Sequence, residues 1–266
     1  MEIKFRKPPI DELVIGVYFD REIDGLRTQH VGLFWQKFRK EFPTARQRPV
    51  TVPVGGGAPG QVEIEFLSSD DEIVPMPRFW FEAADGVTLI QLQKNAFLFN
   101  WRKREAEYPH FDVVKQGFDK NFALFTSFLS TELSVPMAPI AIAELMYVNK
   151  IEECEYWLRP EDTANVLPNF RLPTADKPAV GTLDFVQSTR QSYAHDLFLT
   201  TTVRSARSAR DTRRPVLVFE LRALGALGGV DKSAADEWFI RAHDTIGACF
   251  LAMTNPDIQA RYWERV

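Results

Sequence analysis

Five arginines of this 266-residue chain lie within eleven consecutive residues: Arg204, Arg207, Arg210, Arg213 and Arg214. Arginine binds phosphate or carboxylate through a planar, two-pronged hydrogen-bonding group. The first four follow one another at steps of three, so a flat strand would divide them between its faces, whereas a loop or extended turn could gather them. The segment predicts a contact with an anion, a nucleic acid or an acidic protein. The alternative is a solvated hairpin tip that keeps a sheet edge soluble.

A second basic cluster follows a strand-like run in the first half of the chain, at Trp101-Arg102-Lys103-Arg104. Arg102 and Arg104 therefore join the five arginines as candidate anion-binding or partner-binding residues. The two clusters could share one surface or lie at opposite ends. The arginine-rich segment itself contains no aromatic residue, although aromatic side chains are what binding of single-stranded nucleic acid would favour.

The common catalytic signatures are missing from the sequence. Gly55 and Gly60 have the spacing of a phosphate-binding loop, but Gln61 and Val62 stand where that loop needs Lys and Ser or Thr. A Gly-x-Ser-x-Gly elbow of serine hydrolases does not occur. None of the four histidines has a zinc-like spacing to another histidine or cysteine, and His30 and His243 are expected to pack on or beside apolar helix faces. We expect no cofactor, no resident metal and no catalytic residue.

Two enzyme patterns stay open as an alternative, a metal-dependent phosphoester hydrolase or nuclease. One is an alternating-glutamate strand like that of tunnel triphosphatases, with Leu67 where the lysine should be; the other is a loose nuclease-like pattern, with Arg222 at its lysine position. The candidate metal ligands of these patterns are Glu63, Glu65, Asp184 and Glu220.

Composition bounds the protein class. The chain is 45% hydrophobic with 21 Phe and has a net charge of −4, so a sizeable core is expected, and only a local basic patch could bind a polyanion. Cys154 and Cys249 are too few for a disulfide framework and indicate a reducing compartment. An apolar signal region and membrane-spanning runs are absent from the sequence, so we expect a cytoplasmic protein with no membrane partner.

Hydrophobic periodicity predicts an α+β fold of two β-α-β-β-β-α halves, residues 1–135 and 136–266, joined near Pro136 and Pro139 and packed as one unit. The first half is expected to hold strands at 13–19, 61–67, 78–84, 87–93 and 97–101, a helix at 25–42, a loop at 44–60 and a long helix from Phe111. The second is expected to hold strands at 140–148, 181–189, 196–204 and 215–224, a short helix at 161–167 and a closing helix that ends near Met253. The sheets should be mostly antiparallel, each covered by its long amphipathic helix.

Three segments resemble a family of uncharacterised bacterial proteins of similar length and sporadic distribution. They are Pro8-Pro9-Ile10-x-Glu12, Tyr147-Val148-Asn149-x-Ile151, and a closing helix with Ala242-His243, Ile246, Phe250, Thr254 and Trp263. The family usually has Arg before the Tyr, and this chain has Met146. The resemblance implies a shared fold along the full length. A sporadic distribution suggests an accessory role, such as defence, immunity or a toxin–antitoxin pair.

The sequence therefore favours a non-enzymatic binding or regulatory protein with a protein partner. Nucleic acid is a second class of partner, bound through the arginine-rich hairpin, and a homo-oligomer is compatible with the same residues. A small-ligand pocket between sheet and helices is a third hypothesis.

Overall fold

The computed structural model describes residues 4–50, 76–105, 107–171, 184–208, 211 and 214–266. The strands are β1 (Ile10–Phe19), β2 (Thr44–Arg48), β3 (Arg78–Glu82), β4 (Thr88–Gln93), β5 (Ala96–Arg102), β6 (Ile140–Glu152), β7 (Val186–Ala194), β8 (Leu197–Arg207) and β9 (Pro215–Val230). The helices are α1 (Thr28–Gln36), α2 (Phe111–Glu132), the 3₁₀ turn η1 (Pro160–Asp162), α3 (Thr163–Val166), α4 (Lys232–Met253) and α5 (Pro256–Arg261).

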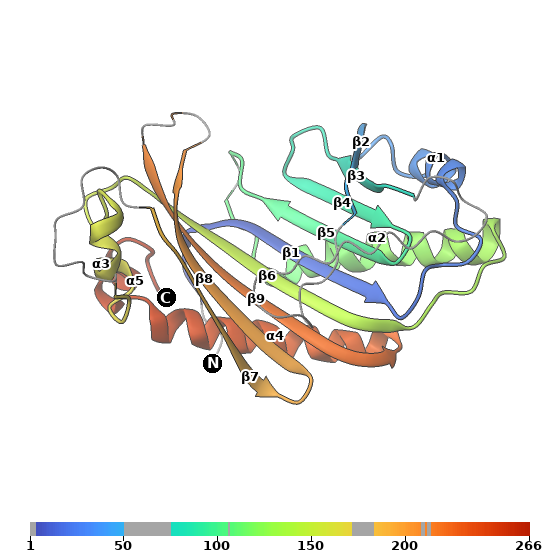
Figure 1. The fold of residues 1–266 in the computed structure, drawn as a ribbon. Helices are drawn as coiled ribbons and strands as arrows, with labels where there is room; N and C mark the ends of the chain where they lie inside the picture. The colour runs from blue at the N-terminus through green and yellow to red at the C-terminus, as the bar shows by residue number, and fades with distance from the viewer. Residues whose placement is uncertain (1–3, 51–75, 106, 172–183, 209–210, 212–213) are drawn as a thin grey trace. The chain divides into compact units, whose positions relative to one another are not determined.

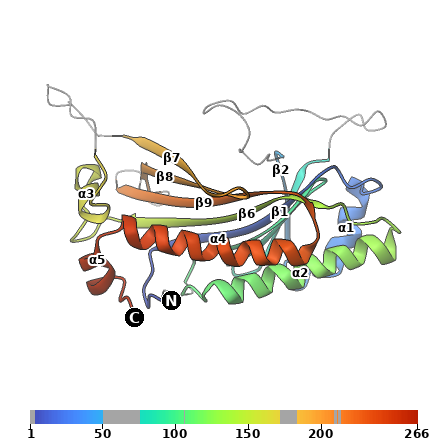
Figure 2. The ribbon, with the colours of Figure 1, turned by 90° about the horizontal axis from the view of Figure 1, so that it is seen from below.

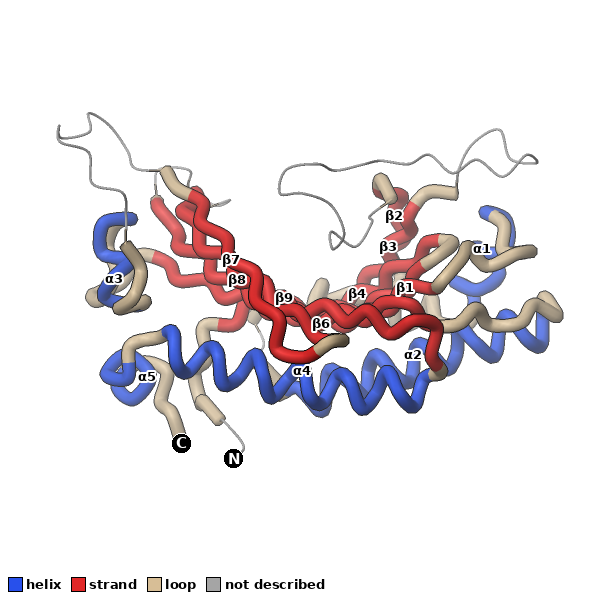
Figure 3. The backbone as a smooth tube through the Cα atoms, turned by 60° about the horizontal axis from the view of Figure 1, so that its bottom comes forward, coloured by secondary structure: helices blue, strands red, loops and turns tan. Residues whose placement is uncertain are grey.

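The strands of the described residues form a single nine-stranded sheet in the order β2-β3-β4-β5-β1-β6-β9-β8-β7 (Figures 1 and 3). The pairs β2–β3, β3–β4, β4–β5 and β7–β8 are antiparallel. The prediction of two β-α-β-β-β-α repeats, each with its own sheet, is therefore wrong. The predicted α+β character and antiparallel pairing are confirmed.

The two sheets expected from the sequence are one because β1 pairs with β6. Lys150 N–H donates to Pro9 O at 2.8 Å, and Asp20 N–H donates to Pro139 O at 3.0 Å, at the opposite end of the pair. Every residue of β1 from Val14 to Phe19 is buried. A strand that is apolar on both faces is stable only in a sheet interior, where its backbone groups are also paired on both edges.

The chain divides into two compact units that do not follow the 135/136 division. Unit 1 consists of Met1–Leu13, Leu145–Ala223 and Ile240–Val266, and unit 2 of Val14–Glu144 and Leu224–Phe239. Each unit draws on both sides of that boundary because β1, β6, β9 and α4 contribute residues to both.

In unit 2 one face of the sheet is covered by helices through phenylalanine contacts. Phe97 of β5 packs against Phe118, Phe122 and Phe125 of α2, with ring centroids 5.4–6.0 Å apart. Phe34 of α1 joins them at 5.4 Å from Phe125. Figure 2 shows α2 running along one face of these strands. The amphipathic helix predicted from Phe111 is confirmed.

A four-charge cluster fastens α2 to the start of α4 within unit 2. Lys115 and Lys232 both bind Asp119 and Asp236, at 2.5–2.8 Å. Burial lowers the pKa of Lys115, but the hydrogen bonds and charges of Asp119 and Asp236 raise it further, so the pKa lies above its usual value. Lys115 therefore stays charged although its side chain is largely covered.

In unit 1 the C-terminal part of α4 packs on β9 and on both chain ends. The Phe250 ring lies 6.0 Å from Phe219 and 5.3 Å from Trp263. Phe5 completes the cluster at 5.7 Å from Phe250, and Arg6 N–H donates to Glu264 O at 3.1 Å. The C-terminal segment is thereby joined to the N-terminal one (Figure 1).

Several predicted boundaries change in the structure. The helix expected at 25–42 is confirmed only for Thr28–Gln36, and the loop expected at 44–60 begins with strand β2. The last strand, expected at 215–224, continues through Gly228 and Gly229 to Val230. The strand expected at 61–67, with Glu63 and Glu65, lies outside the described residues.

Candidate functional site

The cross-strand register of unit 2 places arginines and a tryptophan on one face of the sheet. Arg46 lies opposite Trp80, Arg48 opposite Arg78, and Trp80 opposite Gln91. Residues directly opposite each other share a face, as do residues two apart along a strand. Phe81 and Phe97 contact the helices, so the helices cover the opposite face of the sheet from Trp80. The polar side chains are therefore on the face away from α1 and α2.

We call Arg46, Arg48, Arg78, Trp80 and Arg102 of this face the basic face. The guanidinium carbons of Arg48 and Arg78 lie 4.9 Å and 5.4 Å from the centre of the Trp80 ring, within cation–π range. Arg46 and Arg48 are exposed, and Arg78 and Trp80 are half-buried. Two exposed cationic side chains and one half-buried aromatic ring thus lie together on this face.

A buried glutamine fixes the ring and one of the arginines. Gln91 Oε1 accepts hydrogen bonds from Arg78 Nη1 at 2.9 Å and from Trp80 Nε1 at 3.0 Å. Gln91 Nε2 donates to Asn100 Oδ1 at 2.7 Å. Both polar atoms of the amide are used, so Trp80 and Arg78 are held in defined orientations.

Glu82 is the carboxylate among these arginines. It accepts a hydrogen bond from Arg102 Nη2 at 2.5 Å and lies 3.9 Å from Arg46 Nη2. Arg102 Nη2 also donates to Gly86 O at 2.9 Å, while its buried Nε has no hydrogen-bond partner among the described residues. Glu82 thus pairs with two of the four arginines of the basic face.

The basic face also adjoins a buried tyrosine. Tyr18 O–H donates to Glu144 Oε2 at 2.8 Å, and both side chains are buried. Burial lowers the pKa of Arg78, Tyr18 raises it, and the like charge of Arg48 lowers it again. Arg78 thus remains a cation that is partly removed from water, which strengthens its attraction for an anion.

The arginine-rich segment is not gathered into a loop at its start. Arg204 and Arg207 both lie within β8, three residues apart, so the strand directs them to opposite faces. Arg210 and Arg213 lie outside the described residues. Arg214 Nε lies 3.9 Å from Asp211 Oδ2, and Arg214 O accepts from Ser208 N–H at 3.0 Å.

Of the second predicted cluster, Arg102 belongs to the basic face and Arg104 follows it outside β5. Arg104 Nη1 donates to Lys103 O at 3.2 Å. Sequence reasoning missed Arg46, Arg48 and Arg78. The alternation Arg46-Gln47-Arg48 was the available signal, and the prolines on both sides of it suggested a loop instead.

The residues of the alternative enzyme do not form a metal site in the described chain. Asp184 precedes β7, and Glu220 lies on β9. Because β8 lies between β9 and β7, these two acidic residues are not placed on neighbouring strands, contrary to the nuclease-like pattern. Asp184 Oδ1 lies 3.5 Å from Ser205 Oγ. Among the described residues, no group of three His, Cys, Asp or Glu side chains is placed to hold a metal ion.

His30 and His243 have structural partners. His30 Nδ1 accepts from Arg27 N–H at 3.2 Å and caps the first turn of α1. His243 Nδ1 is 2.9 Å from Tyr147 Oη, which joins α4 to β6 in unit 1. Asp196, beside His195, accepts from Arg241 Nη2 at 2.5 Å.

Comparisons of the chain with protein-family models, with curated proteins and with solved structures gave no match. The resemblance to a sporadically distributed bacterial family therefore stays a prediction. Its three segments all fall in unit 1 and touch one another there: Lys150 N–H donates to Pro9 O, Tyr147 meets His243, and Trp263 packs on Phe250. Met146, where the family usually has Arg, is half-buried on β6.

None of the helices in the described ranges combines the length and apolar character needed to cross a bilayer.

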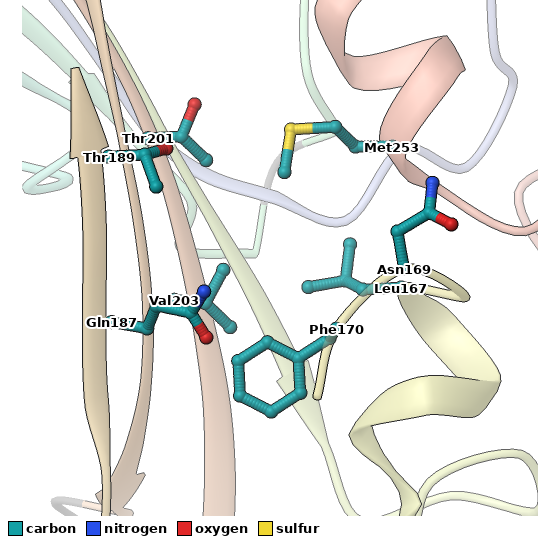
Figure 4. A pocket seen from close by; sticks show the side chains of 8 residues that line it. All are labelled: Leu167, Asn169, Phe170, Gln187, Thr189, Thr201, Val203 and Met253. Carbon is teal, nitrogen blue, oxygen red and sulfur yellow. The ribbon is translucent and has the colours of Figure 1, made fainter. Parts of the chain in front are cut away.

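Unit 1 contains a pocket of about 90 Å³ between β7, β8, the residues after α3 and the end of α4. Its lining is uncharged and comprises Leu167, Asn169, Phe170, Gln187, Thr189, Thr201, Val203 and Met253. Figure 4 shows these side chains converging from the strands on one side and from the helical segments on the other. The pocket fits the small-ligand hypothesis in position, between sheet and helices, but its volume is small for a drug-sized molecule.

Cys249 lies beside this pocket and is expected to react slowly. Burial raises the pKa of its thiol, although hydrogen bonds from Tyr193 and Thr201 lower it. Because the thiolate is the reactive form, iodoacetamide should modify Cys249 in the folded protein at neutral pH at less than about a tenth of the rate in unfolded chain, and faster as pH rises. Tyr193→Phe should slow the reaction further. Peptide mass spectrometry measures the modification rate. Equal rates in the folded protein and in the unfolded chain would contradict the burial of Cys249.

Proposed function

We propose that this protein is a non-enzymatic binding protein that holds an anionic partner on the basic face of unit 2. The observation that carries the proposal is the pair of guanidinium groups, of Arg48 and Arg78, at 4.9 and 5.4 Å from the Trp80 ring. Guanidinium groups bind phosphate through charge-assisted, two-pronged hydrogen bonds, so four arginines on one face suit a phosphate-bearing ligand better than a neutral one.

Single-stranded nucleic acid is the polyanion that this chemistry favours. It offers phosphates to the arginines and unstacked bases to an aromatic ring. A hydrogen bond to Gln91 holds Trp80 in place. Arg48 lies over the ring and is exposed, so its guanidinium can leave the ring and bind a phosphate. A base can then stack where the guanidinium was. The arginine-rich hairpin, in contrast, has no aromatic residue among 204–214.

The test is fluorescence anisotropy of a labelled single-stranded oligonucleotide titrated with the full chain at several salt concentrations. We expect binding at low salt, with a slope of log K against log salt of about −2, since about three arginines each release roughly 0.7 counterion from a single strand. Duplex DNA and polyglutamate serve as competitors. We expect both to compete more weakly, because neither presents an unstacked base.

Two results would overturn the proposal. If the oligonucleotide does not bind at low salt, a polyanion is not the partner. Equal competition by polyglutamate shows that the partner is an acidic protein surface and that the Trp80 ring plays no part in recognition.

The biological setting is a separate part of the proposal. An accessory role in bacterial defence or in a toxin–antitoxin pair rests on the family resemblance alone, and a cytoplasmic location rests on the sequence. Among the described residues, no contact favours the alternative of a metal-dependent hydrolase or nuclease.

A further inference from the structure

The two ends of the sheet are built differently. Strand β2 at one end has five residues, contains Arg46 and Arg48, and is flanked by Pro43 and Pro49. Short length, charge and proline are the features by which proteins prevent a sheet edge from pairing with another strand. Strand β7 at the other end has nine residues, all exposed, and contains no proline and one charged residue.

That one charge, Arg190, is turned away from the open edge. Its guanidinium carbon lies 4.6 Å from the ring centre of Phe198, the residue two strand positions along on β8. A cation held over its own sheet protects the edge poorly, because it repels only a like charge that is placed directly opposite it. β7 therefore combines a long, exposed backbone with little protection.

The backbone groups that face outward follow from the ladder between β7 and β8. Ser205 N–H donates to Phe185 O at 3.0 Å, so Phe185 belongs to a hydrogen-bonded pair of this ladder. Hydrogen-bonded and non-hydrogen-bonded positions alternate in antiparallel strands. The N–H and C=O groups of Val186, Ser188, Arg190 and Ser192 consequently point away from β8.

We propose that β7 is a dimerisation edge, on which β7 of a second copy of this chain pairs in antiparallel orientation about a twofold axis. Full overlap of 186–192 puts Thr189 opposite the partner's Thr189 and Gln187 opposite the partner's Gln191. Ser188 then lies opposite the partner's Arg190, so no like charges face each other. Threonine pairs are favourable cross-strand neighbours, and twofold dimers are the commonest assemblies.

The neighbouring registers are worse. A shift of one outward position in one direction sets Arg190 directly opposite the partner's Arg190, which is destabilising, and a shift in the other direction shortens the overlap. The charge of Arg190 therefore selects the register in which the two β7 strands pair. This register also brings the partner's Gln191 beside Gln187, which lines the pocket of unit 1.

Ser188→Pro tests the edge without touching the β7–β8 ladder, because it removes an outward N–H. Ser188→Ala is the matched control: it removes the same hydroxyl, which is 3.1 Å from Thr202 Oγ1, and keeps the N–H. Sedimentation velocity across the micromolar range should show a dimer of wild type and of Ser188→Ala. Ser188→Pro should raise the dimer dissociation constant at least about tenfold, since two symmetry-related hydrogen bonds are lost.

Hydrogen exchange provides a second measurement on wild type and does not depend on how the proline variant folds. The amides of Ser188, Arg190 and Ser192 should gain protection as protein concentration rises. Wild type that stays monomeric throughout, a proline variant that dimerises like wild type, or protection accompanied by the mass of a different polypeptide would each overturn pairing with a second copy.

Discussion

Arg46→Glu combined with Arg48→Glu is expected to weaken binding of a single-stranded oligonucleotide at least about 100-fold, or about 2.7 kcal/mol. Both side chains are exposed on β2, so the change reverses two charges at the surface while the fold is retained. The loss has two causes: the phosphates meet carboxylates, and the guanidinium of Arg48, which lies over the Trp80 ring, is no longer present to bind a phosphate. Anisotropy titration measures it, with circular dichroism as a check that the variant is folded.

The matched control is Arg204→Glu with Arg207→Glu. It changes the net charge of the protein by the same amount, but β8 directs these two side chains to opposite faces. We expect less than a threefold change in affinity, about 0.6 kcal/mol. If the control loses as much affinity as the β2 double variant, net charge or the hairpin binds the oligonucleotide, and the basic face does not.

Gly225→Ala is expected to destabilise the fold by about 3 kcal/mol. Gly225 lies on β9 beneath the indole of Trp238, which is fully buried. An added Cβ would lie 2.8 Å from Trp238 Cζ2, with Nε1 and Cε2 closer still, and real Cβ atoms do not approach that near. Thermal unfolding should show a melting temperature lower by about 6–12 °C, at 2–4 °C per kcal/mol for a chain of this size.

Gly32→Ala makes the same chemical change but is expected to raise the stability of the fold instead of lowering it. Gly32 lies in the middle of α1, and an added Cβ would meet no atom within 4 Å. Removing a glycine from a helix interior should stabilise the protein by about 0.5–1 kcal/mol. Combining Gly225→Ala with Trp238→Leu should cost less than the two single changes together, because they share one clash. Simple additivity would show that the indole is not the cause.

Local patterns in the sequence specify the local elements. The phenylalanine repeat from Phe111 predicts α2 and its covered face, and the repeat in α4 does the same. Asp85-Gly86 predicts the turn between β3 and β4, where Gly86 has a φ of +68° and Asp85 Oδ1 accepts from Val87 N–H at 2.9 Å. These features depend on residues close together in the chain, so periodicity and turn chemistry are sufficient to find them.

The candidate site could not be found in this way. The basic face exists because β2 pairs with β3, which puts Arg46 and Arg48 beside Trp80 and Arg78 across a gap of some thirty residues in the chain. The sequence shows the alternation in Arg46-Gln47-Arg48, but it does not show which strand will lie beside it.

The sequence by itself determined the helices, most strands, the absence of the common catalytic motifs and the presence of basic residues. Tertiary structure decided that β1 joins β6, so that one sheet replaces two repeats, and that β7 is left as its open edge. It also brought Arg46 and Arg48 of β2 beside Trp80 and Arg78 of β3, which is where we propose that an anion binds. The physical reason is that propensity and periodicity act within a segment, whereas strand partners and register are chosen by contacts between segments that are distant in the chain.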